Sequence, residues 1–126
     1  MKPVARPVHL DLLRIHLPLP GWVSILHRVS GALLFLAVPL GTWALSVSLT
    51  DEAAFGRMAD ALAHPFARLV LLVLVWAFSH HLFAGLRHLG LDVHRGTALA
   101  QARRTSLAVI AASGLVTLVA AARLFA

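Results

Sequence analysis

The 126-residue sequence contains no cysteine and no tyrosine, and it has only five acidic residues. The absence of cysteine excludes disulfide bonds, iron–sulfur clusters held by thiolates, and haem attached covalently through a Cys-x-x-Cys-His motif. The sequence also lacks a glycine-rich phosphate loop and a dinucleotide-binding fingerprint. Chemistry that requires a soluble catalytic domain must therefore belong to other chains.

Apolar residues dominate what is present. They make up 60% of the chain, charged residues make up 13%, and the mean hydropathy is +0.85. Three stretches without Asp, Glu, Lys or Arg (29–50, 69–86 and 105–122) are each about long enough to cross a bilayer. These features predict an all-α integral membrane protein, a single membrane-anchor domain over 1–126. We expect an N-terminal arm over 1–21 and transmembrane helices over about 22–48, 64–89 and 105–124.

The few charges are distributed unevenly along the chain. Basic residues outnumber acidic ones in 1–28 and 87–104, whereas 51–60 holds three acids and one arginine. The positive-inside rule then predicts a cytoplasmic N-terminus and second loop and an external C-terminus. Because the basic residues lie at helix ends and not on one polar face, we expect no nucleic-acid partner. The chain has no recognisable secretory signal or presequence, so a bacterial inner membrane fits best.

The second apolar run ends in two histidines on one helix face, His81 and His88. His81 lies six residues before Arg87, so about 9 Å of helix separates it from the membrane interface. Ionisable side chains at such depth usually serve ligation, proton relay or ion passage. We interpret His81 as an axial ligand of a haem, which must be b-type because no cysteine can attach it. Gly85, one turn away, leaves space for a macrocycle or another helix.

Two features of this interpretation stay open on spacing alone. His81 or its neighbour His80 could instead hydrogen-bond another helix as a packing contact. His88 lies nearer the surface and could meet a haem propionate or a lipid head group. The uncharged runs of the other two predicted helices contain no histidine. A second axial ligand would therefore come from another subunit or a symmetry mate.

The first predicted helix begins with a polar face. Ser24, His27, Arg28 and Gly31 follow the spacing i, i+3, i+4 and i+7, which places them on one side of a helix. Since consecutive membrane helices run antiparallel, this face should meet the end of the second helix that carries His88 and form a polar pocket. The alternative is an interfacial anchor in which Arg28 reaches lipid phosphate.

These motifs together resemble one family. Arg6-Pro7-Val8, the run Ser24-Ile25-Leu26-His27-Arg28-Val29-Ser30-Gly31, and His81-x3-Gly85-Leu86-Arg87-His88-x3-Asp92 are similar to the cytochrome b subunit of succinate dehydrogenase. The likeness extends from Arg6 to Asp92 and is followed by a third helix. Leu91 departs from it, because family members usually carry an aromatic residue or methionine there.

The resemblance implies half of a heterodimeric bundle that holds one haem b with a second transmembrane anchor subunit, which supplies the other axial histidine. It assigns the iron ligand to His81, the quinone site to Ser24 and Arg28, and propionate contacts to His27, Arg28 or His88. FAD and the iron–sulfur clusters would lie only in the flavoprotein and iron–sulfur partner subunits. The family's pocket tyrosine belongs to the partner anchor, which agrees with the absence of tyrosine here.

The expected function is therefore that of a non-autonomous subunit of succinate:quinone oxidoreductase, with quinone as substrate and no activity in the isolated chain. Two other functions remain as alternatives at this stage. One is a structural anchor that binds neither haem nor quinone, and the other is a small proton-conducting subunit that uses the histidines as a relay.

Overall fold

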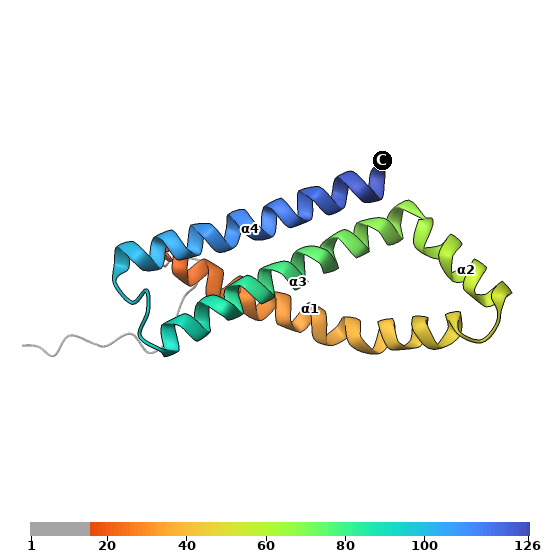
Figure 1. Ribbon diagram of the computed structural model, residues 1–126, viewed down its shortest axis with the longest axis horizontal. Helices are drawn as coiled ribbons and strands as arrows, with labels where there is room; N and C mark the ends of the chain where they lie inside the picture. The colour runs from red at the N-terminus through yellow and green to blue at the C-terminus, as the bar shows by residue number, and fades with distance from the viewer. Residues whose placement is uncertain (1–15) are drawn as a thin grey trace, which may run out of the picture.

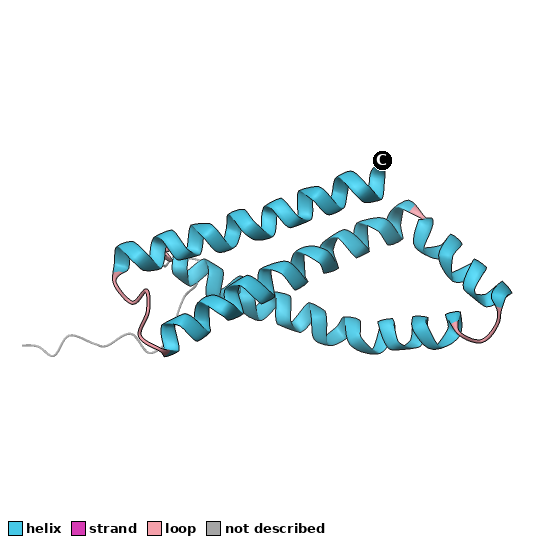
Figure 2. Cartoon of the chain, viewed as in Figure 1, coloured by secondary structure: helices cyan, strands magenta, loops and turns pink. Residues whose placement is uncertain are grey.

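The computed structural model describes residues 16–126, and most of the predicted N-terminal arm, including Arg6-Pro7-Val8, lies outside them. Within this range the chain forms four helices and no strand (Figures 1 and 2). They are α1 (Leu19–Ser48), α2 (Glu52–Ala63), α3 (Pro65–Asp92) and α4 (Leu99–Phe125). The three long helices are each apolar and long enough to cross a membrane. The prediction of an all-α protein with three transmembrane helices is confirmed.

Helix α3 is the central element of the bundle. It packs against α1 on one side and α4 on the other, and Figure 1 shows α1 crossing α3 and then diverging toward α2. The three long helices meet in a small core of Val23, Ala84 and Val109, against which Phe83 packs. Small side chains dominate because membrane helices gain from close van der Waals contact more than from burial of apolar area.

The buried hydroxyls on α4 show how this packing avoids unpaired polar groups. Ser106 and Ser113 are both almost fully buried. Ser106 Oγ donates to Ala102 O at 2.7 Å, and Ser113 Oγ donates to Val109 O at 2.8 Å. Because each hydroxyl is satisfied within its own helix, α4 presents a small and chemically neutral surface to α3.

The helix boundaries differ from the predicted ones in ways that have local causes. Helix α1 begins at Leu19 with Pro20 in its first turn, where a missing N–H removes no helical hydrogen bond. Helix α3 starts at Pro65 after the cap His64, whose Nδ1 accepts from Phe66 N at 3.2 Å, and it runs to Asp92. Helix α4 begins at Leu99, six residues before the predicted start. The prediction used the first residue after Arg103 and Arg104, but these charges limit insertion into lipid and do not prevent a helix from forming.

The short helix α2 was not predicted. Asp51 caps it by accepting from Ala54 N at 2.6 Å, and Glu52 lies in its first turn, an arrangement that favours a helix start. His64 separates α2 from Pro65, which begins the next helix. The Asp-Glu pair was a usable local signal for a helix between the first two spans.

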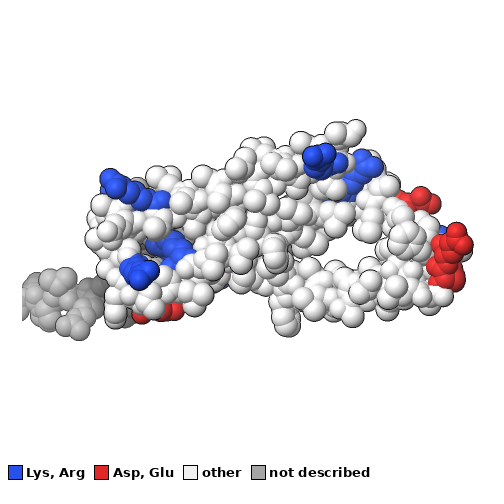
Figure 3. Space-filling view, in the orientation of Figure 1, with Lys and Arg blue, Asp and Glu red and all other residues white. Residues whose placement is uncertain are grey.

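Charged residues gather at the two ends of the bundle (Figure 3). One end, called here the basic end, has five arginines and one aspartate: Arg28, Arg87, Arg95, Arg103, Arg104 and Asp92. The other end, the mixed end, has three acids and three arginines: Asp51, Glu52, Asp60, Arg57, Arg68 and Arg123. At the mixed end Arg68 Nη1 donates to Leu124 O at 2.9 Å, which ties the last turn of α4 to the first turn of α3 and matches the negative end of the helix dipole.

Candidate functional site

The crossing of α1 and α3 is built from two histidine–glycine pairs. His27 and Gly31 lie one turn apart on α1, and His81 and Gly85 lie one turn apart on α3. A methyl group at position 31 would lie 2.8 Å from His81 Cε1, and one at position 85 would lie 3.6 Å from His27 Nε2. Each imidazole therefore rests against the glycine of the opposite helix, and the two rings stack with centroids 4.2 Å apart and an angle of 22° between their planes.

The His81 ring is held by hydrogen bonds to α1. Its Nδ1 lies 3.0 Å from the carbonyl oxygen of His27 and 3.3 Å from Ser30 Oγ. The Ser30 hydroxyl donates to the same carbonyl at 2.9 Å, so its oxygen is free to accept. Because a carbonyl oxygen only accepts, Nδ1 must be the donor in this bond. In a neutral ring the lone pair is then on Nε2.

His88 lies next to His27 of this stack, on the side toward the basic end. Their ring centroids are 5.0 Å apart with an interplanar angle of 31°. The expected meeting of the polar start of the first span with the end of the second is therefore seen for these two residues. His88 Nε2 is an enclosed atom with no hydrogen-bond partner among the described residues. Because this nitrogen is enclosed, a ligand atom would reach it only after the His88 ring turns outward.

The neighbouring His80 has a different environment. Its side chain is only 1% exposed and stacks on Trp76 with centroids 5.5 Å apart. It lies in the interior of this chain, so its contacts are those of a packing residue. His81 is only partly buried, which leaves it within reach of a group bound between chains.

An apolar groove begins one turn deeper than the histidine stack. It is a shallow and open depression of about 570 Å³ where α1 and α3 diverge, and α1 supplies all of its lining residues except Phe78. Its lining residues are Leu34, Ala37, Val38, Gly41, Thr42, Leu45 and Phe78. Phe78 precedes His81 by three residues and Leu34 follows Gly31 by three, so the groove continues along the same two helix faces. The histidines thus stand between an apolar groove and the basic end.

Ser24 and Arg28 do not share the contacts of His27 and Gly31. Ser24 is half-buried and Arg28 is exposed. Each residue of a helix is rotated about 100° from the next, so Arg28 is directed to the side of α1 when His27 points toward α3. The structure divides the predicted polar face into a part that contacts α3 and a part that other molecules can reach.

Sequence reasoning missed the contribution of Ser30 and of the His27 main chain. Ser30 is fully buried, and its hydroxyl braces the carbonyl that holds the His81 ring. The available signal was its spacing, since Ser30 lies three residues after His27 on the same helix. Arg95 and Thr105, which line a small pocket at the basic end, were also not singled out.

The sequence is similar to known proteins over most of its length. Residues 2–120 match the family described as succinate dehydrogenase/fumarate reductase transmembrane subunit. The chain is 34% identical over 109 residues to the succinate dehydrogenase cytochrome b556 subunit of Coxiella burnetii, covering 86% of this chain and 87% of that one. It is 37% identical over 109 residues to the subunit of the same name from Paracoccus denitrificans, covering 86% and 83%.

Proposed function

Because the chain belongs to the succinate dehydrogenase/fumarate reductase transmembrane subunit family, as a membrane anchor of the succinate dehydrogenase cytochrome b type, we propose that it ligates one haem b through His81 and forms part of a quinone-reduction site with Ser24 and Arg28. Members of this family are subunits of an oxidoreductase complex and span the membrane several times. The proposal goes beyond family membership by naming the residues involved, the type of haem and the substrate.

The observation that carries the haem assignment is the hydrogen bonding of His81. A histidine that ligates a metal through Nε2 almost always donates its Nδ1–H to a carbonyl, carboxylate or water, which fixes the ring and raises its basicity. His81 has this arrangement, with the His27 carbonyl 3.0 Å from Nδ1. His80 is enclosed by its own chain, so a group bound between chains does not reach it, and this difference in burial supports His81 as the ligand.

The surroundings of His81 fit a haem b. The groove of about 570 Å³ offers an apolar wall for a macrocycle, and the basic end offers polar partners for carboxylates. The exposed Arg28, next to His27 on α1, fits contact with propionates, and His88 would contact one only after its enclosed Nε2 turns outward. Haem b, when bound, supplies one-electron transfer within the membrane.

At the quinone site, this chain's residues act on charge and orientation. Reduction places negative charge on the quinone oxygens, and a fixed donor with a nearby cation stabilises that charge. We propose that the Ser24 hydroxyl donates to a quinone carbonyl oxygen and orients the ring, while the exposed Arg28 guanidinium acts electrostatically. Arginine stays protonated in such a pocket.

The partners follow from the same proposal. A second transmembrane anchor subunit would supply the other axial histidine, and iron–sulfur and flavoprotein subunits would carry the clusters and FAD. The isolated chain would then have no activity. The His81 Nδ1 bond to α1 is also the packing contact of a purely structural anchor, so the presence of haem is what distinguishes the two functions. A proton relay would not need the apolar groove beside the histidines.

The test is the spectrum of the complex purified through a tag on this chain. We expect co-purification of three further subunits, and sharp low-spin b-haem bands on reduction with succinate. A complex of the same subunits without these bands would leave only the structural anchor. If the same bands persist in a complex that is purified through a tag on another subunit from cells lacking this chain, the haem assignment is contradicted.

We further propose that the basic end faces the cytoplasm in a bacterial inner membrane, because of the excess of arginine there. A reporter fusion after Glu52 should indicate the outside, and a fusion after Arg95 should indicate the cytoplasm. A fusion after Thr97 provides a second test of the same loop. The opposite pattern would contradict the orientation and place the quinone pocket on the wrong side for soluble partner subunits.

A further inference from the structure

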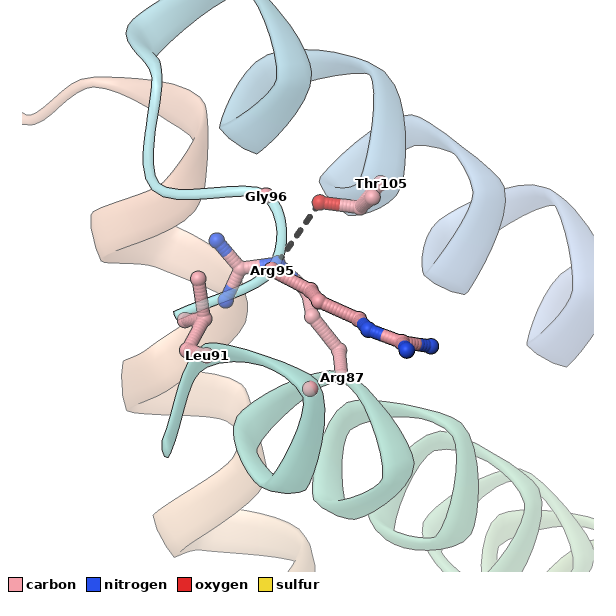
Figure 4. Close-up of a pocket in the computed structure, with 6 residues that line it drawn as sticks. Arg87, Leu91, Arg95, Gly96 and Thr105 are labelled. Carbon is pink, nitrogen blue, oxygen red and sulfur yellow. Dashed lines mark hydrogen bonds between the residues drawn. The ribbon is translucent and has the colours of Figure 1, made fainter. Parts of the chain in front are cut away.

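The loop between α3 and α4 forms a small pocket with the two helix ends that it joins. The pocket has a volume of about 200 Å³ and is lined by Arg87, Gly90, Leu91, Arg95, Gly96 and Thr105 (Figure 4). Two of these residues are arginines and none is acidic. We propose that this pocket binds the phosphate group of an anionic phospholipid, a site that depends on neither the haem nor the quinone assignment.

Arg87 is the fixed element of the site. Its Nε donates to Thr105 Oγ1 at 3.1 Å, and Thr105 in turn donates to Ala102 O at 3.2 Å. This bond orients the planar guanidinium and leaves its two terminal nitrogens to donate elsewhere. A guanidinium held in this way loses little further entropy when it binds a phosphate through two donors.

The loop that completes the pocket is held on α3 by main-chain bonds. His94 N donates to Leu91 O and Arg95 N donates to Gly90 O, both at 2.9 Å. Gly96 has φ +81°, a conformation that glycine adopts without strain, and it lets the chain turn toward α4 past the Arg87 side chain. The wall of the pocket is therefore part of the folded loop.

Arg95 belongs to the rim of the pocket. Its side chain is exposed, and in Figure 4 it extends in a different direction from the Arg87 guanidinium. We assign it the weaker role of raising the local positive potential. Arg87 is the residue whose donors contact the phosphate.

The position of the pocket favours a lipid over a free anion. Arg87 lies five residues before the end of α3 and Thr105 six residues after the start of α4, which is the level of head groups at the end of a span. Exposed leucines flank the pocket on both helices: Leu86, Leu89, Leu99 and Leu107. A head group in the pocket would leave its acyl chains beside these side chains, a contact that inorganic phosphate does not make.

The experiment measures lipid retention by the intact complex. The complex is placed in phosphatidylcholine bilayers that contain a minority of phosphatidylglycerol, and the amount of phosphatidylglycerol is raised in steps. At each step native mass spectrometry counts the phosphatidylglycerol molecules that stay bound to the complex. We expect one retained phosphatidylglycerol whose affinity falls on the order of tenfold in Arg87→Gln, since a charge-assisted hydrogen bond is lost. Arg103→Gln is the matched control, because it removes an exposed arginine at the same end that does not line the pocket, and it should leave retention unchanged.

Two further variants keep the test decisive if Arg87→Gln does not assemble. Arg87→Lys keeps the charge but loses the Nε bond, and Thr105→Val removes the acceptor, so each should give a partial loss. Equal retention in every pocket variant and in Arg103→Gln would overturn the proposal. Competition by inorganic phosphate as effective as that by phosphatidylglycerol would show a small-anion site instead. Loss of the soluble subunits with unchanged lipid retention would assign the pocket to a protein contact and also overturn it.

Discussion

The complex that carries His81→Leu should lose the low-spin b-haem spectrum of the wild-type complex. Leucine has no lone pair for iron, and its size is close enough to that of histidine to keep the helices apart by a similar distance. Loss of an outer partner alone costs roughly 10- to 100-fold in metal affinity, so loss of the ligand itself should lower haem affinity by about 100-fold or more. Absorption and electron paramagnetic resonance spectra of the purified complex measure the change.

His80→Leu is the matched control for this experiment. It replaces the adjacent histidine, whose Nε2 is already enclosed and unpaired among the described residues, so an apolar replacement should be tolerated and the spectrum should persist. Loss in His80→Leu with retention in His81→Leu would move the assignment by one residue. Retention in both variants would reject a haem site on α3.

A graded variant probes the ring position without removing the ligand. In Gly31→Ala the new methyl group would lie 2.8 Å from His81 Cε1, and overpacking of this kind costs about 1–3 kcal/mol. The ring must shift, so we expect altered g-values with the haem retained. Gly114→Ala is its control, because this residue lies on α4, outside the apolar groove, and no atom lies within 4 Å of the position that a methyl group would take there.

The second large effect is expected at the quinone site. Ser24→Ala and Arg28→Leu should each lower succinate:quinone activity on the order of a hundredfold, the typical effect of removing one preorganised donor to a developing oxyanion. Succinate oxidation with an artificial acceptor that draws electrons from the soluble subunits should survive, because under the proposed function the flavin and clusters would lie in other chains. The two activities are measured on the same purified complex.

Two variants distinguish this role from a defect in assembly. Ser46→Ala removes an exposed hydroxyl on α1 that bonds only its own helix, at Trp43 O, and should keep both activities. Arg28→Lys keeps the positive charge and should retain part of the quinone activity. Equal loss of both activities in Ser24→Ala and Arg28→Leu would indicate failed assembly. Full quinone activity in both would rule out the proposed roles.

The sequence predicted the elements that depend on composition. Long runs without charge were sufficient to locate three spans, because lipid excludes unpaired charge from the bilayer centre. The same rule could not locate the start of α4, since Arg103 and Arg104 lie in helical turns at the basic end, where water or head groups solvate them. It also gave no reason to expect α2, which depends on the cap at Asp51 and not on hydropathy.

The arrangement of the site depended on where two helices cross. The spacing identified Gly85 as a position of close approach but not the group that approaches it, which is His27 of α1. His80 and His81 differ by one helical step, and only the rotation of α3 between α1 and α4 decides which of them is buried. Arg28 was grouped with His27 by spacing, and the same rotation separates them.

The paired histidine and glycine contacts also fix the position of His81 relative to α1 in bilayers of different thickness. Helices α1 and α3 contain 30 and 28 residues, so they are about 45 and 42 Å long and exceed a hydrocarbon core of about 30 Å. Such helices adjust to a thinner or thicker bilayer by tilting. Sliding by one residue would move each ring about 1.5 Å off its glycine, so the crossing should stay in register. The adjustment would then occur where α1 and α3 diverge toward α2, and electron-transfer distances measured from His81 to the basic end would not change with the lipid.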